Sequence, residues 1–178
     1  INQATLAYGY GVSVTPLQLA QAYAVLGNEG SMQSISLVGI DQPSDSQRVV
    51  SPDTAVAVRR MLEEVVRPGG TGTKASVDGY RIAGKTGTAW KAADGGYSED
   101  KYISIFAGLA PASDPRLATV VVIDEPGGEL YYGSDVAAPV FADVMAESLR
   151  LLAVAPDAMP PREPGTELQA MAKRTPSR

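Results

Sequence analysis

Residues 102–123, YISIFAGLAPASDPRLATVVVI, predict the middle of a β-sheet. Apolar side chains alternate along 102–110, which is typical of a strand, and the proline-bounded link at 111–115 leaves room only for a tight turn. Residues 117–123 are apolar on both faces and predict a central strand. A β-prone stretch at 80–83 precedes them, and three consecutive strands with short links predict an antiparallel meander.

Three amphipathic segments predict helices that flank this sheet. Thr15-Pro16 and Ser51-Pro52 each place a capping hydroxyl before a proline, which is typical of a helix start, and the first helix is expected over 15–30. The third helix is expected over 137–153, with a buried stripe of Phe141, Met145, Leu149 and Leu152. We therefore expect an α/β fold of the α+β type, an antiparallel sheet flanked by helices.

The remaining segments are polar or rich in proline. Residues 91–100 contain Gly95-Gly96 and predict a hairpin or a longer loop, and residues 127–134 predict a loop. From Pro156 onward, prolines and polar residues dominate. We expect residues 1–155 to belong to one domain and residues 156–178 to form a flexible C-terminal tail.

Composition limits the possible chemistry. The chain has 178 residues, a formal net charge of −5, no cysteine and no histidine. Disulfides, Cys- or His-ligated metals and a Ser-His-Asp triad are therefore excluded, and catalysis must use Ser, Thr, Lys, Tyr or carboxylates. The acidic balance argues against nucleic acid as a partner. No apolar run reaches the roughly 18 residues that span a bilayer. Ile1 is not an initiator residue, and we interpret it as a cut or processed end.

Residues 79–88, GYRIAGKTGT, allow two interpretations. Residues 79–86 match the phosphate-loop pattern G-x-x-x-x-G-K-[ST], and VVVIDE at 120–125 resembles the strand whose terminal acid holds magnesium. A phosphate loop must open a helix, whereas this motif is followed by glycines and its middle residues favour extended backbone. The second interpretation is a strand that runs through Lys85.

As a strand, Lys85-Thr86-Gly87-Thr88 would form a cationic wall rich in hydroxyl groups. Strand alternation places Lys85 and Gly87 on one face and the two threonines on the other. Gly87 leaves room for a substrate to approach the backbone. Such a strand could bind a carboxylate and offer a backbone N–H to a developing oxyanion, and the alternative is a plain surface strand.

Four blocks resemble the transpeptidase domain of class B penicillin-binding proteins, most closely the septal cell-division enzymes of Gram-negative bacteria. They are YGYGVSVTPLQLAQAYAVLGNEG (8–30), GYRIAGKTGTA (79–89), YISIFAGLAPASDPRLATVVVIDEP (102–126) and APVFADVMAESLRLL (138–152). The resemblance covers about residues 2–155. It implies the serine β-lactamase-like fold, of which this chain would hold only the C-terminal part.

The resemblance also implies the roles of the site residues. Lys85, a catalytic residue, would keep the site positive and contact the serine of an S-x-N element, and the Thr88 N–H would form part of the oxyanion hole. Thr86, Gly87 and Thr88 would bind the substrate, with the two hydroxyls holding the carboxylate of a D-Ala-D-Ala stem peptide or of a β-lactam. Septal enzymes gather aromatic side chains near the ligand, or else these are ordinary half-buried tyrosines: Tyr102, Tyr131 and Tyr132.

The catalytic serine of this family lies in an S-x-x-K element upstream of this chain, as does the S-x-N element. Ser98-x-x-Lys101 also fits S-x-x-K, but its flanking acids would keep Lys101 protonated and exposed, and Thr71–Lys74 fails for similar reasons. Trp90 departs from several relatives, which carry a basic residue there. Asp124-Glu125 is expected to be a strand-end turn and not a metal site.

The implied function is the cross-linking of peptidoglycan during septum formation by a serine-type D,D-transpeptidase that β-lactams acylate. This chain alone would be inactive. Expected partners are stem peptides, β-lactams, the upstream half of the domain and divisome membrane proteins, on the periplasmic side of the inner membrane. No metal or organic cofactor is implied. Three alternatives remain: a non-catalytic domain of the same fold, a serine β-lactamase relative and a P-loop NTPase.

Overall fold

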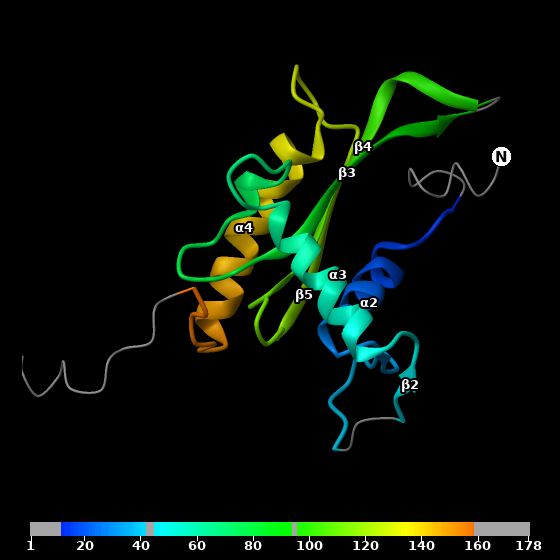
Figure 1. Cartoon of the computed structure of the whole chain (residues 1–178). Helices are drawn as coiled ribbons and strands as arrows, with labels where there is room; N and C mark the ends of the chain where they lie inside the picture. The colour runs from blue at the N-terminus through cyan, green and yellow to red at the C-terminus, as the bar shows by residue number, and fades with distance from the viewer. Residues whose placement is uncertain (1–11, 42–44, 94–95, 159–178) are drawn as a thin grey trace, which may run out of the picture.

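The computed structural model describes residues 12–41, 45–93 and 96–158. Its centre is a sheet of three antiparallel strands (Figure 1), which are adjacent in the order in which they follow along the chain: β3 (Ala83–Ala93), β4 (Gly96–Ala110) and β5 (Leu117–Asp124). The predicted antiparallel meander is therefore confirmed. A second pairing joins the short strands β1 (Ser31–Met32) and β2 (Gln47–Arg48).

Helices cover both faces of the sheet. Helix α4 (Gly133–Leu151) packs on one face, and α2 (Pro16–Gly27) and α3 (Pro52–Glu64) pack on the other, as Figure 1 shows. A single turn of 3₁₀-helix, η1 (Thr73–Ala75), lies beside α4. The predicted fold class, an antiparallel sheet flanked by helices, is confirmed.

Within the described residues, the order of the strands differs from one prediction. Strand β4 lies in the centre and β5 at an edge of the sheet formed by the described residues, whereas residues 117–123 were expected to be central. The apolar pattern reports burial on both faces and not pairing on both edges. Because α4 and α2 both pack against β5, an edge strand here carries the composition of a central one.

The capping signals located two helix starts correctly. The Thr15 hydroxyl accepts a hydrogen bond from the Gln18 N–H, the Gln18 side chain accepts one from the Thr15 N–H, and Pro16 opens α2. The Ser51 hydroxyl likewise accepts from the Thr54 N–H at the start of α3. Helix α2 ends at Gly27 and residues 28–30 form a turn, so the expected 15–30 was slightly too long.

Helix α4 differs more from its prediction. It begins at Gly133, four residues before the expected 137, and it ends at Leu151. Phe141, Met145 and Leu149 are fully buried as predicted, but Leu152 is 60% exposed. Leu152 is therefore not part of the buried stripe, because it is already the C-terminal cap, where the chain leaves the helical course.

Strands β3 and β4 extend beyond the end of β5 as a two-stranded ribbon. Strand β3 was expected to begin near residue 80, but it begins at Ala83 and continues to Ala93. Residues 91–93 and 96–100 form the outer part of this ribbon, with Ala93 paired to Gly96, which confirms the hairpin and excludes the longer loop. The pairing is regular to Trp90↔Tyr102 and shifts between Trp90 and Ala92.

Two apolar clusters hold the layers together. Phe106 of β4 packs against Phe141 of α4, with ring centroids 4.6 Å apart, in the cluster that also contains Met145 and Leu149. Leu109 of β4 belongs to the second cluster, on the side of α2 and α3. Phe106 and Leu109 thus point to opposite faces of the sheet and are buried in different clusters. A shift of one residue would exchange these faces, so the two clusters fix the register of β4. Within the described residues, no helix is long and apolar enough to cross a membrane.

Candidate active-site wall on strand β3

The Lys85–Thr88 segment lies on β3, at a free edge of the sheet formed by the described residues. Lys85 is exposed, and its Nζ donates to the Thr86 carbonyl oxygen at 3.0 Å and to Thr86 Oγ1 at 3.2 Å. The Thr86 carbonyl therefore points away from β4. Because backbone direction repeats every two residues in a strand, the Thr88 N–H faces the same free edge.

The two threonine side chains contact groups that come from other elements. Thr86 Oγ1 lies 3.3 Å from Thr71 Oγ1, in the connection between α3 and η1. Thr88 Oγ1 accepts a hydrogen bond of 2.9 Å from the Gly133 N–H, the first residue of α4. The structure thus brings together Lys85, Thr86 and Thr88, and it adds Thr71, which sequence reasoning had considered only as part of a failed S-x-x-K pattern.

The N-terminus of α4 sits directly on the paired strands. A Cβ atom on Gly133 would lie within 2.5 Å of the Gly87 carbonyl oxygen and would also collide with the Ile105 backbone, so this position has no room for a side chain. Asp135, in the first turn, pairs with Lys74 at 2.7 Å. The positive end of the helix dipole therefore lies next to Thr88 and Gly87.

Gly87 itself has an open side. A Cβ there would come no closer than 3.6 Å to the Ile105 side chain, which is an ordinary van der Waals contact. The expected room beside Gly87 is therefore present. By contrast, a Cβ on Gly84, three residues earlier on β3, would lie 2.7 Å from the Phe106 ring. The strand therefore changes from a tightly packed segment to an open one over the three residues from Gly84 to Gly87.

Ser104 is a buried polar residue next to this wall that sequence reasoning missed. It is fully buried, lies opposite Thr88 in the β3–β4 pairing, and donates a hydrogen bond to the Tyr131 carbonyl oxygen. Thr88 and Ser104 together fix both sides of the point where the loop after β5 enters α4. The available signal was a hydroxyl inside an otherwise apolar strand, since a buried hydroxyl needs a partner.

The three predicted tyrosines form one stack. The rings of Tyr102 and Tyr131 lie nearly parallel with centroids 4.0 Å apart, and those of Tyr131 and Tyr132 are 4.5 Å apart. The Tyr131 hydroxyl donates a hydrogen bond of 3.2 Å to the Tyr132 hydroxyl. This hydrogen bond is the main cause that raises the pKa of Tyr131 to about 12. The stack continues the wall from Thr88 toward the ribbon, because Tyr131 and Tyr132 immediately precede Gly133.

Two lysines form ion pairs with the acidic side chains at the end of β5. Lys91 Nζ contacts Asp124 at 2.9 Å and Glu125 at 2.7 Å, and Lys101 contacts Glu125 at 3.2 Å. The hydrogen bond from Lys91 lowers the pKa of Glu125. The hydrogen bonds that Lys91 makes to Glu125 and Asp124 raise the pKa of Lys91. Among the residues that the structure describes, no group of three or more acidic side chains could hold a metal ion.

Two competing patterns lose their support. Ser98 donates to Asp100 and Lys101 pairs with Glu125, so the S-x-x-K pattern at 98–101 engages other groups. Lys85 and Thr86 lie within β3 and do not open a helix, so the phosphate-loop interpretation is wrong. Trp90, the departure noted in the sequence, is 48% exposed at the base of the ribbon.

Comparison with known proteins agrees with the fold. The family described as "Penicillin binding protein transpeptidase domain" matches residues 1–146. "Peptidoglycan D,D-transpeptidase FtsI" of Escherichia coli K12 is 47% identical over 159 residues, which are 89% of this chain and 27% of that protein. "Probable peptidoglycan D,D-transpeptidase PenA" of Neisseria flavescens is 43% identical over 88% of this chain and 39% of that protein.

A solved structure has the same fold over about half of its length. The apo transpeptidase (TP) domain of penicillin-binding protein 3 from Burkholderia pseudomallei aligns with a TM-score of 0.81 and 44% identity, over 89% of this chain and 48% of that one. This chain therefore spans only part of these relatives. Its match to the family over most of its length shows that the chain belongs to the penicillin-binding protein transpeptidase domain family.

Proposed function

We propose that this chain forms one wall of the active site of a serine-type peptidoglycan D,D-transpeptidase. The observation that carries the proposal is the convergence of three kinds of donor at the free edge of β3. These are the Lys85 ammonium group, the hydroxyls of Thr86 and Thr88 and the outward N–H of Thr88. The names of the relatives, peptidoglycan D,D-transpeptidases, support the reaction class.

The donors suit a peptide that ends in a carboxylate. The Lys85 ammonium and the two hydroxyls would hold the terminal carboxylate of a D-Ala-D-Ala stem, with charge-assisted hydrogen bonds. The carbonyl of the scissile bond would then lie next to the Thr88 N–H. That N–H would stabilise the oxyanion as the carbonyl carbon becomes tetrahedral, a contribution that typically reaches 10²–10³ in rate for one donor.

The covalent step uses a serine upstream of this chain. Its oxygen would bond to the carbonyl carbon, the amide C–N bond would break, and D-Ala would leave as the amine, whose nitrogen takes the proton that the serine hydroxyl gives up. The amine of a neighbouring stem peptide would then attack the ester, form the new amide and release the serine. A β-lactam would occupy the same wall through its carboxylate and would leave an acyl-enzyme.

Tyr102, Tyr131 and Tyr132 would contact the part of the ligand that lies beyond Thr88, since their stack continues the same wall. We further propose that the complete protein acts in septum formation on the periplasmic side of the inner membrane, together with the upstream half of the domain and divisome membrane proteins. The relationship to FtsI supports this placement.

The test is the rate at which a fluorescent penicillin acylates the complete protein that contains this chain. Lys85→Ala should lower that rate by about 10² or more, because it removes the cation that orients the carboxylate. Lys101→Ala is the matched control, an exposed lysine in an ion pair away from the wall, and should react like the parent. Thermal unfolding midpoints of both variants establish that they are folded.

Three outcomes would contradict the proposal. Equal acylation of Lys85→Ala and the parent would remove the assigned role of the strand. A folded parent that takes no label would favour a non-catalytic domain. Rapid release of the hydrolysed penicillin by the parent would favour a β-lactamase-like relative.

A further inference from the structure

The chain beyond α4 turns back onto the sheet. The Ala153 N–H donates to the Arg150 carbonyl oxygen at 3.1 Å and the Val154 N–H donates to the Leu149 carbonyl oxygen at 3.0 Å. Ala153 has a φ of 49°, in the left-handed region, so these contacts form the Schellman motif that ends many helices. Val154 then packs against the cluster around Phe141, and its carbonyl oxygen accepts a 2.6 Å hydrogen bond from the Tyr80 hydroxyl.

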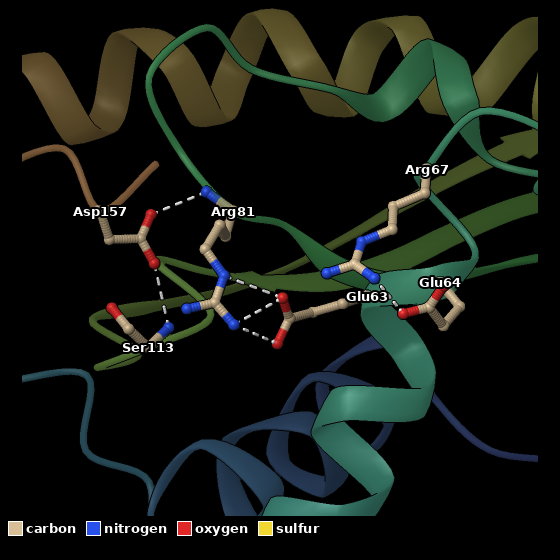
Figure 2. A network of polar contacts seen from close by, with 6 residues as sticks. All are labelled: Glu63, Glu64, Arg67, Arg81, Ser113 and Asp157. Atoms are coloured by element: carbon tan, nitrogen blue, oxygen red, sulfur yellow. Dashed lines mark hydrogen bonds and ion pairs between the residues drawn. The ribbon is translucent and has the colours of Figure 1, made fainter. Parts of the chain in front are cut away.

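Asp157 joins this segment to two others. One carboxylate oxygen accepts the Arg81 N–H at 2.7 Å, and the other accepts the Ser113 N–H at 3.0 Å. Figure 2 shows the carboxylate between these two backbone nitrogens. The next residue adds a third link, because the Ala158 N–H donates to the Gly79 carbonyl oxygen at 3.0 Å. A carboxylate that accepts two backbone N–H groups is among the stronger hydrogen-bonding arrangements in proteins.

Arg81 lies at the junction of these contacts, two residues before β3. Its carbonyl oxygen accepts the Ala112 N–H at 2.7 Å, so its backbone is held on both sides. Its guanidinium makes two 2.9 Å hydrogen bonds to Glu63 of α3, which is 6% exposed (Figure 2). The start of β3 is thereby tied to α3, to the β4–β5 connection and to the segment after α4.

We propose that residues 152–158 are a clamp that completes the fold of this domain, with Asp157 as the residue that fixes the start of β3 against the β4–β5 connection. The clamp lies beyond residue 146, where the family match ends. The ordered unit therefore extends to at least Ala158, past the boundary at residue 155 that the sequence predicted. The rest of the expected tail, residues 159–178, lies outside the described residues.

The experiment compares four variants of the complete protein. Asp157→Ala removes both acceptors, Asp157→Asn keeps one, and the chain is stopped either after Ala155 or after Ala158. Glu147→Ala is the matched control, since Glu147 pairs with Arg150 one turn away on the exposed side of α4. The readouts are amide hydrogen exchange in peptides covering residues 79–84 and 112–116, and the thermal unfolding midpoint.

Asp157→Ala and the stop after Ala155 should both raise exchange at Arg81 and Ser113 at least about tenfold and lower the midpoint by about 2–5 °C. Asp157→Asn should do so at one of the two amides, because its NH₂ cannot accept. The stop after Ala158 and Glu147→Ala should match the parent.

The proposal is overturned if the stop after Ala155 leaves exchange and midpoint unchanged, or if Glu147→Ala changes exchange at Arg81 as much as Asp157→Ala does. None of these readouts uses acylation, so the outcome is independent of the proposed function.

Discussion

The polar groups just before β3 and those within the Lys85–Thr88 segment differ in how they are bonded. Just before the strand, the backbone N–H, the carbonyl and the side chain of Arg81 all bond to other segments of the chain. Four residues later, Lys85 is exposed and donates to the adjacent Thr86, while the backbone of Thr86 faces the free edge. The first arrangement immobilises the strand, and the second leaves donors available to a ligand. A site of this kind needs both, because donors stabilise a transition state only when they are held in place beforehand.

The contact between α4 and the wall offers the most severe way to disturb this arrangement. Gly133→Ala should lower the free energy of unfolding by about 2–4 kcal/mol, because the new Cβ would overlap backbone atoms of β3 and β4 that cannot move independently. Gly127→Ala is the control, as a Cβ there meets nothing within 4 Å. Urea unfolding of both variants measures the difference, and equal stabilities would show that α4 does not rest on Gly87.

A second pair of variants separates the two ends directly. Arg81→Ala should cost about 1–3 kcal/mol in stability, since it leaves the buried carboxylate of Glu63 without its partner. Lys85→Ala should change stability by less than about 0.5 kcal/mol, because Lys85 is exposed. If the two variants lose the same stability, as judged by their urea midpoints, the distinction between a fixed end and an open end is wrong.

Ser104→Ala tests the link between β4 and the aromatic loop. The variant should lose about 1–2 kcal/mol in the free energy of unfolding, because the Tyr131 carbonyl oxygen loses its buried donor. Ser148→Ala is a suitable control, since that hydroxyl bonds only within α4. Equal losses in the two variants, measured by chemical unfolding, would mean that Ser104 does not anchor the loop.

The smallest effect concerns the tyrosine pair. Tyr131 has a pKa of about 12, chiefly because its hydroxyl is hydrogen-bonded to that of Tyr132. Tyr132→Phe should move the pKa of Tyr131 down toward the ordinary value near 10. Ultraviolet titration of the tyrosinates in the parent and in the variant would reveal the shift. A titration curve that differs from the parent's only by the loss of one ordinary tyrosine would contradict the stacked geometry.

Signals that act over a few residues predicted much of this molecule. The caps at Thr15 and Ser51 located α2 and α3, and the Lys85–Thr88 pattern located the candidate site. The same local logic fails for α4, whose N-terminal cap is Tyr132 and makes no side-chain cap hydrogen bond. With no capping signal, the helix was placed four residues late, and the packing of Gly133 against Gly87 was not foreseen.

Contacts between distant residues account for the remaining differences. Asp157 bonds to groups 76 and 44 residues away, and its proline-rich surroundings suggested only flexibility. Ser104 and Thr71 acquire their roles from segments that lie side by side only in the folded chain. The edge position of β5 among the described residues was not predicted, because composition reports which faces are buried and not which edges are paired.

The most direct test of the central claim is a crystal structure of the complete transpeptidase domain after acylation by benzylpenicillin. The ligand carboxylate should lie within hydrogen-bond distance of the Thr86 and Thr88 hydroxyls, and the acyl carbonyl oxygen should accept the Thr88 N–H. A bound penicillin whose carboxylate contacts neither threonine, or whose carbonyl oxygen points away from β3, would show that this strand is not the wall of the site.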